Sequence, residues 1–133
     1  MESVNEALQI ARTMHIIPIE AEALTKRADC YTHIGDLAAA ESDLKESLAL
    51  AKSRHLVEAA MDARTKLARI YERQKDYLRS LENLELAIDS IESIRTRIPT
   101  PELRTAFVAK NWRPYEDAIR ALSFLHDQAP EQG

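Results

Sequence analysis

Cys30 and His33 are the residues of this sequence whose types and spacing most directly suggest chemistry. They lie three positions apart in a segment with helical spacing, so their side chains are neighbours on one helix face. A thiol beside an imidazole could form a nucleophilic site. Such a site also needs an oxyanion hole and a third group that orients the base, and no glycine-rich or strand-ending segment supplies them. We therefore expect Cys30 to fill space as a small apolar group, with a thiol enzyme built on Cys30 and His33 as the less favoured alternative.

Metal binding is the other chemistry to consider for the four histidines, His15, His33, His55 and His126. None of them has another His, Asp or Glu at a recognisable ligand spacing. The single cysteine excludes an internal disulfide and a multi-cysteine zinc site within one chain. We predict no catalytic, metal-binding or cofactor-binding residues, and we expect His15 and His55 to lie near helix C-termini, where positive charge is favoured.

The composition favours one helical domain. The chain has 133 residues, 45% of them apolar and 30% charged, which is enough for a single core. Two glycines leave little material for phosphate-binding loops or tight β-turns. There is neither an apolar run that could span a membrane nor a secretion signal, so we expect a cytoplasmic protein. The net charge of -4 disfavours nucleic acid and anionic membranes as partners.

The sequence repeats itself at an interval of 40 residues. The matches with most weight involve residue types that are uncommon here: His15 with His55, Tyr31 with Tyr71, and Asp36 with Asp76. Within each interval the apolar residues follow helical spacing, as Leu24 and Ala28 do before Tyr31. Each interval therefore holds two helices.

The turn within the first full repeat contains Gly35 and Asp36. Gly35 can take the left-handed conformation that ends a helix, and Asp36 can cap the next one. The second repeat has Lys75 at the position of Gly35. Because Lys75 carries a Cβ, we expect its turn to be more strained or differently shaped.

These patterns predict an all-α fold, a right-handed α-solenoid of antiparallel helix pairs with about seven helices. The expected repeat domain covers residues 1–127, with a partial unit near 1–16 and further units near 17–55, 56–97 and 100–127. We expect Trp112 to plug the packing of the last helices. The polar tail at 128–133 is expected to be disordered.

The repeat resembles the tetratricopeptide repeat (TPR), a helix–turn–helix unit with large, small and aromatic residues at fixed offsets. In the first full unit these are Leu24, Ala28, Tyr31, Ala40 and Leu44. The family unit has about 34 residues, whereas this interval is longer. The resemblance implies a non-catalytic scaffold that binds a protein, a peptide or an adjoining domain of the parent chain, without a cofactor.

Residues 91–116 carry a second, more specific resemblance. The stretch Ile98-Pro99-Thr100-Pro101, followed by Phe107, looks like the TPR segment that precedes the CHAT domain, a caspase-like peptidase domain of bacterial proteins. On this resemblance the chain is the regulatory arm of a larger bacterial protein. The catalytic His and Cys of that family belong to the domain that follows.

Helical-repeat arrays generally bind ligands on the concave surface lined by the first helix of each repeat. Repeat alignment nominates these residues for that surface: Glu22, Thr25, Lys26, Asp29, His33, Asp62, Thr65, Lys66, Arg69, Glu72 and Arg73. The carboxylate clamp of co-chaperone members is absent, because Thr25 and Asp29 stand at its positions. An ordinary solvated helix face would carry similar residues. An RNA-binding helical repeat is a further alternative, but the acidic residues Asp29, Asp62 and Glu72 oppose it.

The first helix, near residues 2–14, aligns with the second helix of a repeat whose first helix is missing. Val4, Leu8 and Ala11 would then have only part of their packing. We expect the chain either to self-associate through this uncapped helix or to leave an apolar patch exposed there.

Overall fold

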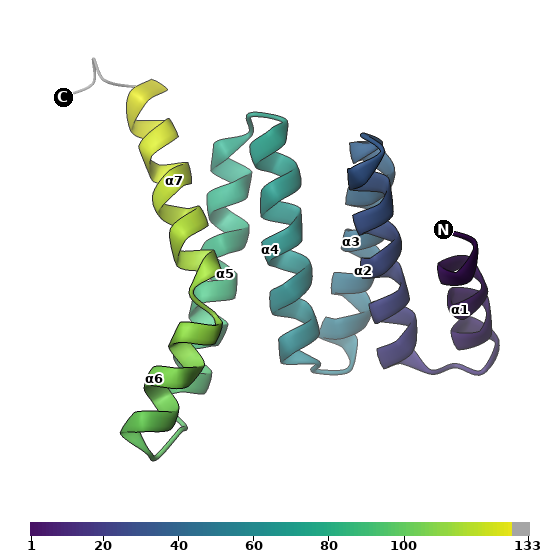
Figure 1. Cartoon of the computed structure of the whole chain (residues 1–133), viewed down its shortest axis with the longest axis horizontal. Helices are drawn as coiled ribbons and strands as arrows, with labels where there is room; N and C mark the ends of the chain where they lie inside the picture. The colour runs from purple at the N-terminus through teal and green to yellow at the C-terminus, as the bar shows by residue number, and fades with distance from the viewer. Residues whose placement is uncertain (129–133) are drawn as a thin grey trace.

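The computed structural model describes residues 1–128 and consists of seven α-helices joined by short turns (Figure 1). The helices are α1 (Glu2–Thr13), α2 (Ile17–His33), α3 (Leu37–Ser53), α4 (Val57–Arg73), α5 (Tyr77–Arg95), α6 (Pro101–Lys110) and α7 (Arg113–Gln128). Residues 1–128 contain no strand, so the predicted all-α fold is confirmed. Of the tail expected at 128–133, Gln128 is instead the last residue of α7, and 129–133 lie outside the described residues.

The helices stack in pairs along one direction. α2 packs with α3 and α4 with α5, while α1 packs on α2, α3 on α4, and α7 on α5. In Figure 1, α3 lies behind α2, and α5 lies between α4 and α7. The first helices of the two pairs, α2 and α4, also meet. This translation from pair to pair is the TPR-like α-solenoid that the 40-residue repeat predicts.

Four turns share one backbone conformation and recur every 20 residues. The residues with positive φ are His15 (+56°), Gly35 (+88°), His55 (+55°) and Lys75 (+63°). In each turn the following residue donates its N–H to a carbonyl five positions back, as Asp76 does to Tyr71 and Leu56 to Ala51, both at 2.8 Å. This is the Schellman ending of a helix. His15 and His55 therefore do lie at helix C-termini, as predicted.

The turn at Lys75 has the same shape as the turn at Gly35, so of the two expected alternatives the strained turn holds and the different shape does not. Its φ of +63° and its hydrogen bonds follow the same pattern. Asp76 then caps α5 by accepting from the N–H of Arg79 at 3.2 Å, as Asp36 caps α3. Packing of α5 on α4 fixes the direction of the chain, which holds Lys75 left-handed at a cost of about 1–2 kcal/mol.

Replacing Lys75 by glycine is expected to raise the free energy of unfolding by about 0.5–1 kcal/mol. Glycine removes the Cβ clash of the left-handed conformation, although it adds entropy to the unfolded chain. Urea denaturation followed by circular dichroism measures the change. Gln74→Gly is the matched control, because Gln74 has φ -84° and glycine there should lower stability. A Lys75→Gly variant less stable than the wild type would contradict the assigned strain.

The main core lies where α3 joins the two pairs. Its buried residues come from α2, α3 and α4, and they are Ala28, Ala40, Leu44, Leu67, Ile70 and Tyr71. The alanines let the helix backbones approach, and the large side chains fill the space between them. The two pairs are therefore held by one continuous packed cluster.

Buried polar side chains also join α2 to α3. Asp43 is 5% exposed and accepts hydrogen bonds from Arg27 at 2.7 and 2.9 Å. The hydroxyls of Thr25 and Ser47 lie 3.0 Å apart, and Ser47 donates to the Ala21 carbonyl at 2.9 Å. Each of these buried groups has a partner, so their burial does not destabilise the pair.

The C-terminal helices do not form the third hairpin that the unit at 100–127 implied. α6 buries none of its residues, whereas α7 packs on α5. The two helices follow one another end to end beside α5 (Figure 1). The helix breaks at Asn111 and Trp112, because Pro114 has no N–H to donate back into α6. Together, α6 and α7 take the place of the first helix of a third pair.

An ion-pair position that recurs between first helices shows the register of α7. Lys66 of α4 lies 2.9 Å from Asp29 of α2, and Asp117 of α7 lies 3.4 Å from Arg69 of α4. Asp29 and Arg69 stand one 40-residue interval apart. Ion pairs at equivalent positions therefore join α2 to α4 and α4 to α7, with the acidic and basic partners exchanged. The position of α7 on α4 matches the position of α4 on α2.

Tyr115 fastens α7 to α5 by donating its hydroxyl to Glu92 at 2.5 Å. Partial burial, and then this hydrogen bond, raise the pKa of Tyr115 to about 12. Hydrogen bonds from Tyr115 and Arg95 lower the pKa of Glu92. Trp112 does not plug the core as expected, because it is 46% exposed and stacks on Tyr115 at 5.3 Å between ring centroids.

Candidate binding groove

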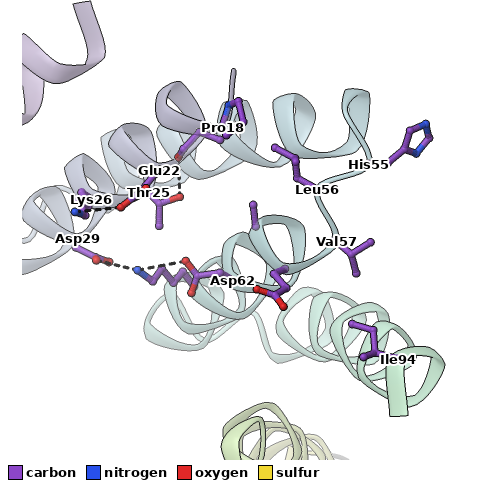
Figure 2. Close-up of a pocket in the computed structure, with 14 residues that line it drawn as sticks. Pro18, Glu22, Thr25, Lys26, Asp29, His55, Leu56, Val57, Asp62 and Ile94 are labelled. Carbon is purple, nitrogen blue, oxygen red and sulfur yellow. Dashed lines mark hydrogen bonds and ion pairs between the residues drawn. The ribbon is translucent and has the colours of Figure 1, made fainter. Parts of the chain in front are cut away.

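An open groove of about 810 Å³ lies between α2 and α4 and reaches the turn between α3 and α4 (Figure 2). Its apolar lining comes from α2, that turn, the first turn of α4 and the end of α5, and consists of Pro18, Ala21, Leu56, Val57, Ala59 and Ile94. Six residues predicted for the concave surface also line it, namely Glu22, Thr25, Lys26, Asp29, Asp62 and Lys66. Four of these residues belong to α2 and two to α4, so both first helices contribute to the lining.

Ion pairs hold the charged side chains of the groove. Lys26 lies 3.2 Å from Glu22 on α2. Lys66 bridges the two first helices, 2.9 Å from Asp29 and 3.7 Å from Asp62 (Figure 2). Both ammonium groups are thus neutralised by carboxylates of the same groove.

Glu58, in the first turn of α4, adds a fourth carboxylate to the lining. Within residues 1–128 it forms no ion pair. Four carboxylates face two ammonium groups, so the lining carries a net negative charge around an apolar floor. Such a surface favours a ligand with a positive charge beside an apolar group.

Thr25 lies at the floor of the groove and is only 7% exposed. Its hydroxyl bonds within the helix pair, to the carbonyl of Ala21 and to Ser47, both at 3.0 Å. Thr25 therefore contributes shape to the groove and has no free hydroxyl for a ligand.

Thr65 and Arg69 line a second hollow, of about 450 Å³, between α4 and the junction of α6 with α7. Arg69 is engaged with Asp117, whereas Lys110 and Arg113 supply further positive charge to the lining. This hollow adjoins the groove, because Glu58 and Asp62 line both.

Glu72 and Arg73, also predicted for the concave surface, connect neighbouring first helices. Glu72 accepts two hydrogen bonds from Arg120 of α7, at 2.9 and 3.0 Å, and the pKa of Arg120 is raised chiefly by this contact. Arg73 donates to the Thr32 carbonyl of α2 at 3.2 Å. These contacts stabilise the stack.

Cys30 and His33 line a separate hollow of about 640 Å³ beside Met1 and Ile34, at the C-terminal end of α2. Cys30 is half-buried, and no hydrogen bond joins it to His33 in the part of the chain that the structure describes. In that same part no three or more His, Cys, Asp or Glu side chains gather in a way that could hold a metal ion. The hollow adjoins the groove at Asp29, which lines both.

Sequence reasoning missed eight lining residues, which are Pro18, Ala21, His55, Leu56, Val57, Glu58, Ala59 and Ile94. The alignment considered one face of each first helix, whereas these residues lie in helix ends and in a turn. The 20-residue spacing of the turns could have pointed to Leu56 and Val57, since it places that turn beside the start of α2. Nothing in the sequence points to Ile94, which comes from the second helix of the other pair.

Residues 21–54 match the family model of the tetratricopeptide repeat, a segment that covers most of α2 and all of α3. No curated protein and no solved structure matches the chain significantly. Among residues 1–128 no helix is long and apolar enough to cross a membrane. Tetratricopeptide repeats generally mediate interactions between proteins and are generally non-catalytic. With this match in its first full pair and the same stacking in the next, the chain is a tetratricopeptide-like helical-repeat protein, an architecture whose usual partner is another protein.

Proposed function

We propose that the chain is a non-catalytic interaction arm whose α2–α4 groove binds an extended segment of another protein or of an adjoining domain. The observation that carries this proposal is the preformed groove itself, open and apolar at its floor with a surplus of carboxylates. Its walls are helices fixed by the core and by the Lys66 bridge. A rigid site binds without the ordering cost that a flexible one would meet.

The partner segment should carry an apolar side chain next to a lysine or arginine. Leu56, Val57 and Ile94 offer the apolar contact, and Glu58 with Asp62 lies beside them. The carboxylates are open to solvent, so each contributes modestly to affinity. They contribute more to the rate of association and to the selection of the partner. We therefore expect moderate, salt-sensitive binding.

Fluorescence anisotropy with short labelled peptides tests this proposal. A peptide of alternating lysine and valine should bind the wild-type chain, and one with glutamate in place of lysine should not. Glu58→Lys should weaken binding roughly tenfold by removing one attraction and adding one repulsion. Glu85→Lys is the matched control, because Glu85 is exposed on α5 and lines none of these hollows. Equal binding of both peptides, or no effect of Glu58→Lys, would overturn the proposal.

The same assay distinguishes the RNA-binding alternative. A labelled single-stranded RNA should show no saturable binding, because the groove carries more carboxylates than ammonium groups. For the thiol-enzyme alternative, the rate at which iodoacetamide alkylates Cys30 near pH 6 is informative, since an activated thiolate reacts there and an ordinary thiol does not.

The finer part of the proposal is that the arm belongs to a bacterial protein with a CHAT domain. It is supported by the resemblance of residues 91–116 alone. The coding sequence downstream of this segment tests it: a caspase-like domain there would support the proposal, and a stop codon in the native gene would refute it.

A further inference from the structure

The α2–α4 groove continues across α4 into the second hollow, the one lined by Thr65 and Arg69. Glu58 and Asp62 of α4 line both spaces, so one bound segment can occupy the groove and the hollow together. The groove measures about 810 Å³ and the second hollow about 450 Å³. Between them they extend from α2 across α4 to the junction of α6 with α7.

The two spaces carry opposite charge. The groove has four carboxylates against two ammonium groups, and carboxylates of the groove already pair with both ammonium groups. In the second hollow, the lining residues that are not shared with the groove include three cations, Arg69, Lys110 and Arg113, and no carboxylate. The charge of the lining therefore changes sign between α4 and the junction of α6 with α7.

Lys110 and Arg113 are the cations of the second hollow that lack a counter-charge. Both are exposed, and within residues 1–128 neither of them forms an ion pair, whereas Arg69 is engaged with Asp117 at 3.4 Å. Lys110 ends α6 and Arg113 begins α7, so the break between these helices brings the two charges to one place. An anionic group of a ligand would therefore meet two cations that no internal carboxylate occupies.

The second hollow also has an apolar floor. Met61 is 8% exposed, Pro114 is buried and Phe107 is half-buried, and all three line the hollow. A charged group placed over such a floor is partly shielded from water, so its attraction to nearby cations is stronger than on a flat surface.

We infer that the bound segment carries an acidic side chain as well as a basic one. Its lysine or arginine lies in the α2–α4 groove, and its aspartate or glutamate lies in the second hollow against Lys110 and Arg113. This inference rests on the proposed function of the groove and adds a second charge at a defined spacing. Packed helices lie about 8–10 Å apart, and an extended chain advances about 3.3 Å per residue, so the acidic residue stands about three positions from the basic one.

Three labelled peptides that differ at one position test the inference by fluorescence anisotropy. Each contains a short block of lysine and valine and, about three residues from the nearest lysine, a glutamate, a glutamine or a lysine; each is made with that position after the block and before it, because the segment can lie in either direction. In one of the two orders the glutamate peptide should bind the wild-type chain about fivefold more tightly than the glutamine peptide, and the lysine peptide should bind more weakly. The difference should fade in about 0.5 M salt.

Variants of the whole chain locate the second charge. Lys110→Glu should remove the preference for glutamate, and the double variant Lys110→Glu with Arg113→Glu should reverse it in favour of the lysine peptide. Both residues are exposed, so the fold should persist, and circular dichroism checks it. Lys75→Glu is the matched control, because Lys75 is exposed in the turn between α4 and α5 and lines neither space. It should keep the order of the wild type.

Binding of the glutamine peptide reports on the groove alone, so the two proposals can fail separately. If that peptide binds but the glutamate peptide binds no better in either order, the inference is wrong and the proposed function stands. A glutamate preference that the double variant leaves intact would also overturn the inference. If none of the peptides binds, the inference and the proposed function fail together.

Discussion

Replacing Leu44 by alanine is expected to lower the free energy of unfolding by about 3 kcal/mol, within the 2–5 kcal/mol range for buried leucines. Leu44 is 1% exposed and lies in the cluster that joins α2, α3 and α4. Its neighbours Ala28 and Ala40 are too small to fill the space it would leave. Since a domain of this size is stable by only about 5–15 kcal/mol, the loss is a large fraction of the total. Urea denaturation followed by circular dichroism measures it.

Leu86→Ala is the control for Leu44→Ala, because it makes the same chemical change at a side chain that is 48% exposed on α5. It should change stability by less than about 0.5 kcal/mol. If Leu44→Ala cost no more than this control, the cluster could not be the joint between the two helix pairs.

The pairs of helices could be predicted from the sequence because two independent signals agree. Apolar spacing marked the buried faces, and the recurrence of Tyr31 at Tyr71 and of Asp36 at Asp76 marked the interval. The left-handed conformation was predicted at Gly35 but not at His15, His55 or Lys75. Lysine has no preference for the left-handed region, so nothing local distinguishes the backbone at Lys75 from an ordinary helix end. Histidine is enriched in that region, but residues with positive φ are uncommon, so His55 alone is a weak signal.

The arrangement of α6 and α7 could not be predicted in the same way. Proline is common at the start of a helix, so Pro101 and Pro114 suggested two separate helices joined as a hairpin. Whether a chain reverses at such a break depends on which face the second part can bury. Ala118 packs with Leu84 of α5 and Ala68 of α4, and Ala121 is also buried. This packing holds α7 along α5, so that α7 continues in the direction of α6.

The lining of the groove could likewise be predicted only in part. Residues such as Asp29 and Lys66 lie on one face of each first helix, and helical periodicity was enough to nominate them. The rest of the lining depends on how closely α2 and α4 stack and on where α5 ends, which are properties of packing between elements far apart in the sequence. The ion pair between Asp29 and Lys66 across the groove, at 2.9 Å, also depends on this packing and could not be predicted from the sequence.

Arg27→Met is expected to lower the free energy of unfolding by about 3 kcal/mol. Arg27 donates to both carboxylate oxygens of Asp43, at 2.7 and 2.9 Å, and its own pKa is raised chiefly by that hydrogen bonding. Asp43 is 5% exposed, so removing the guanidinium leaves a buried carboxylate without a counter-charge. Methionine keeps the apolar stem, which isolates the effect of the charge. Urea denaturation measures the loss, and Lys26→Met, which breaks the exposed pair with Glu22, should cost less than about 0.5 kcal/mol.

A double-mutant cycle decides whether the ion pair with Asp43 or the other contacts of the Arg27 guanidinium are responsible. Asp43→Leu alone should cost about 1 kcal/mol, because Arg27 is 20% exposed and also donates to Asn5, so its charge can reach water. In the double variant Arg27→Met with Asp43→Leu no charge is left buried, and the total cost should fall below that of Arg27→Met alone. Simple additivity of the two single costs would mean that Arg27 acts through its other contacts, such as the hydrogen bond to Asn5, and that the ion pair between α2 and α3 contributes nothing of its own.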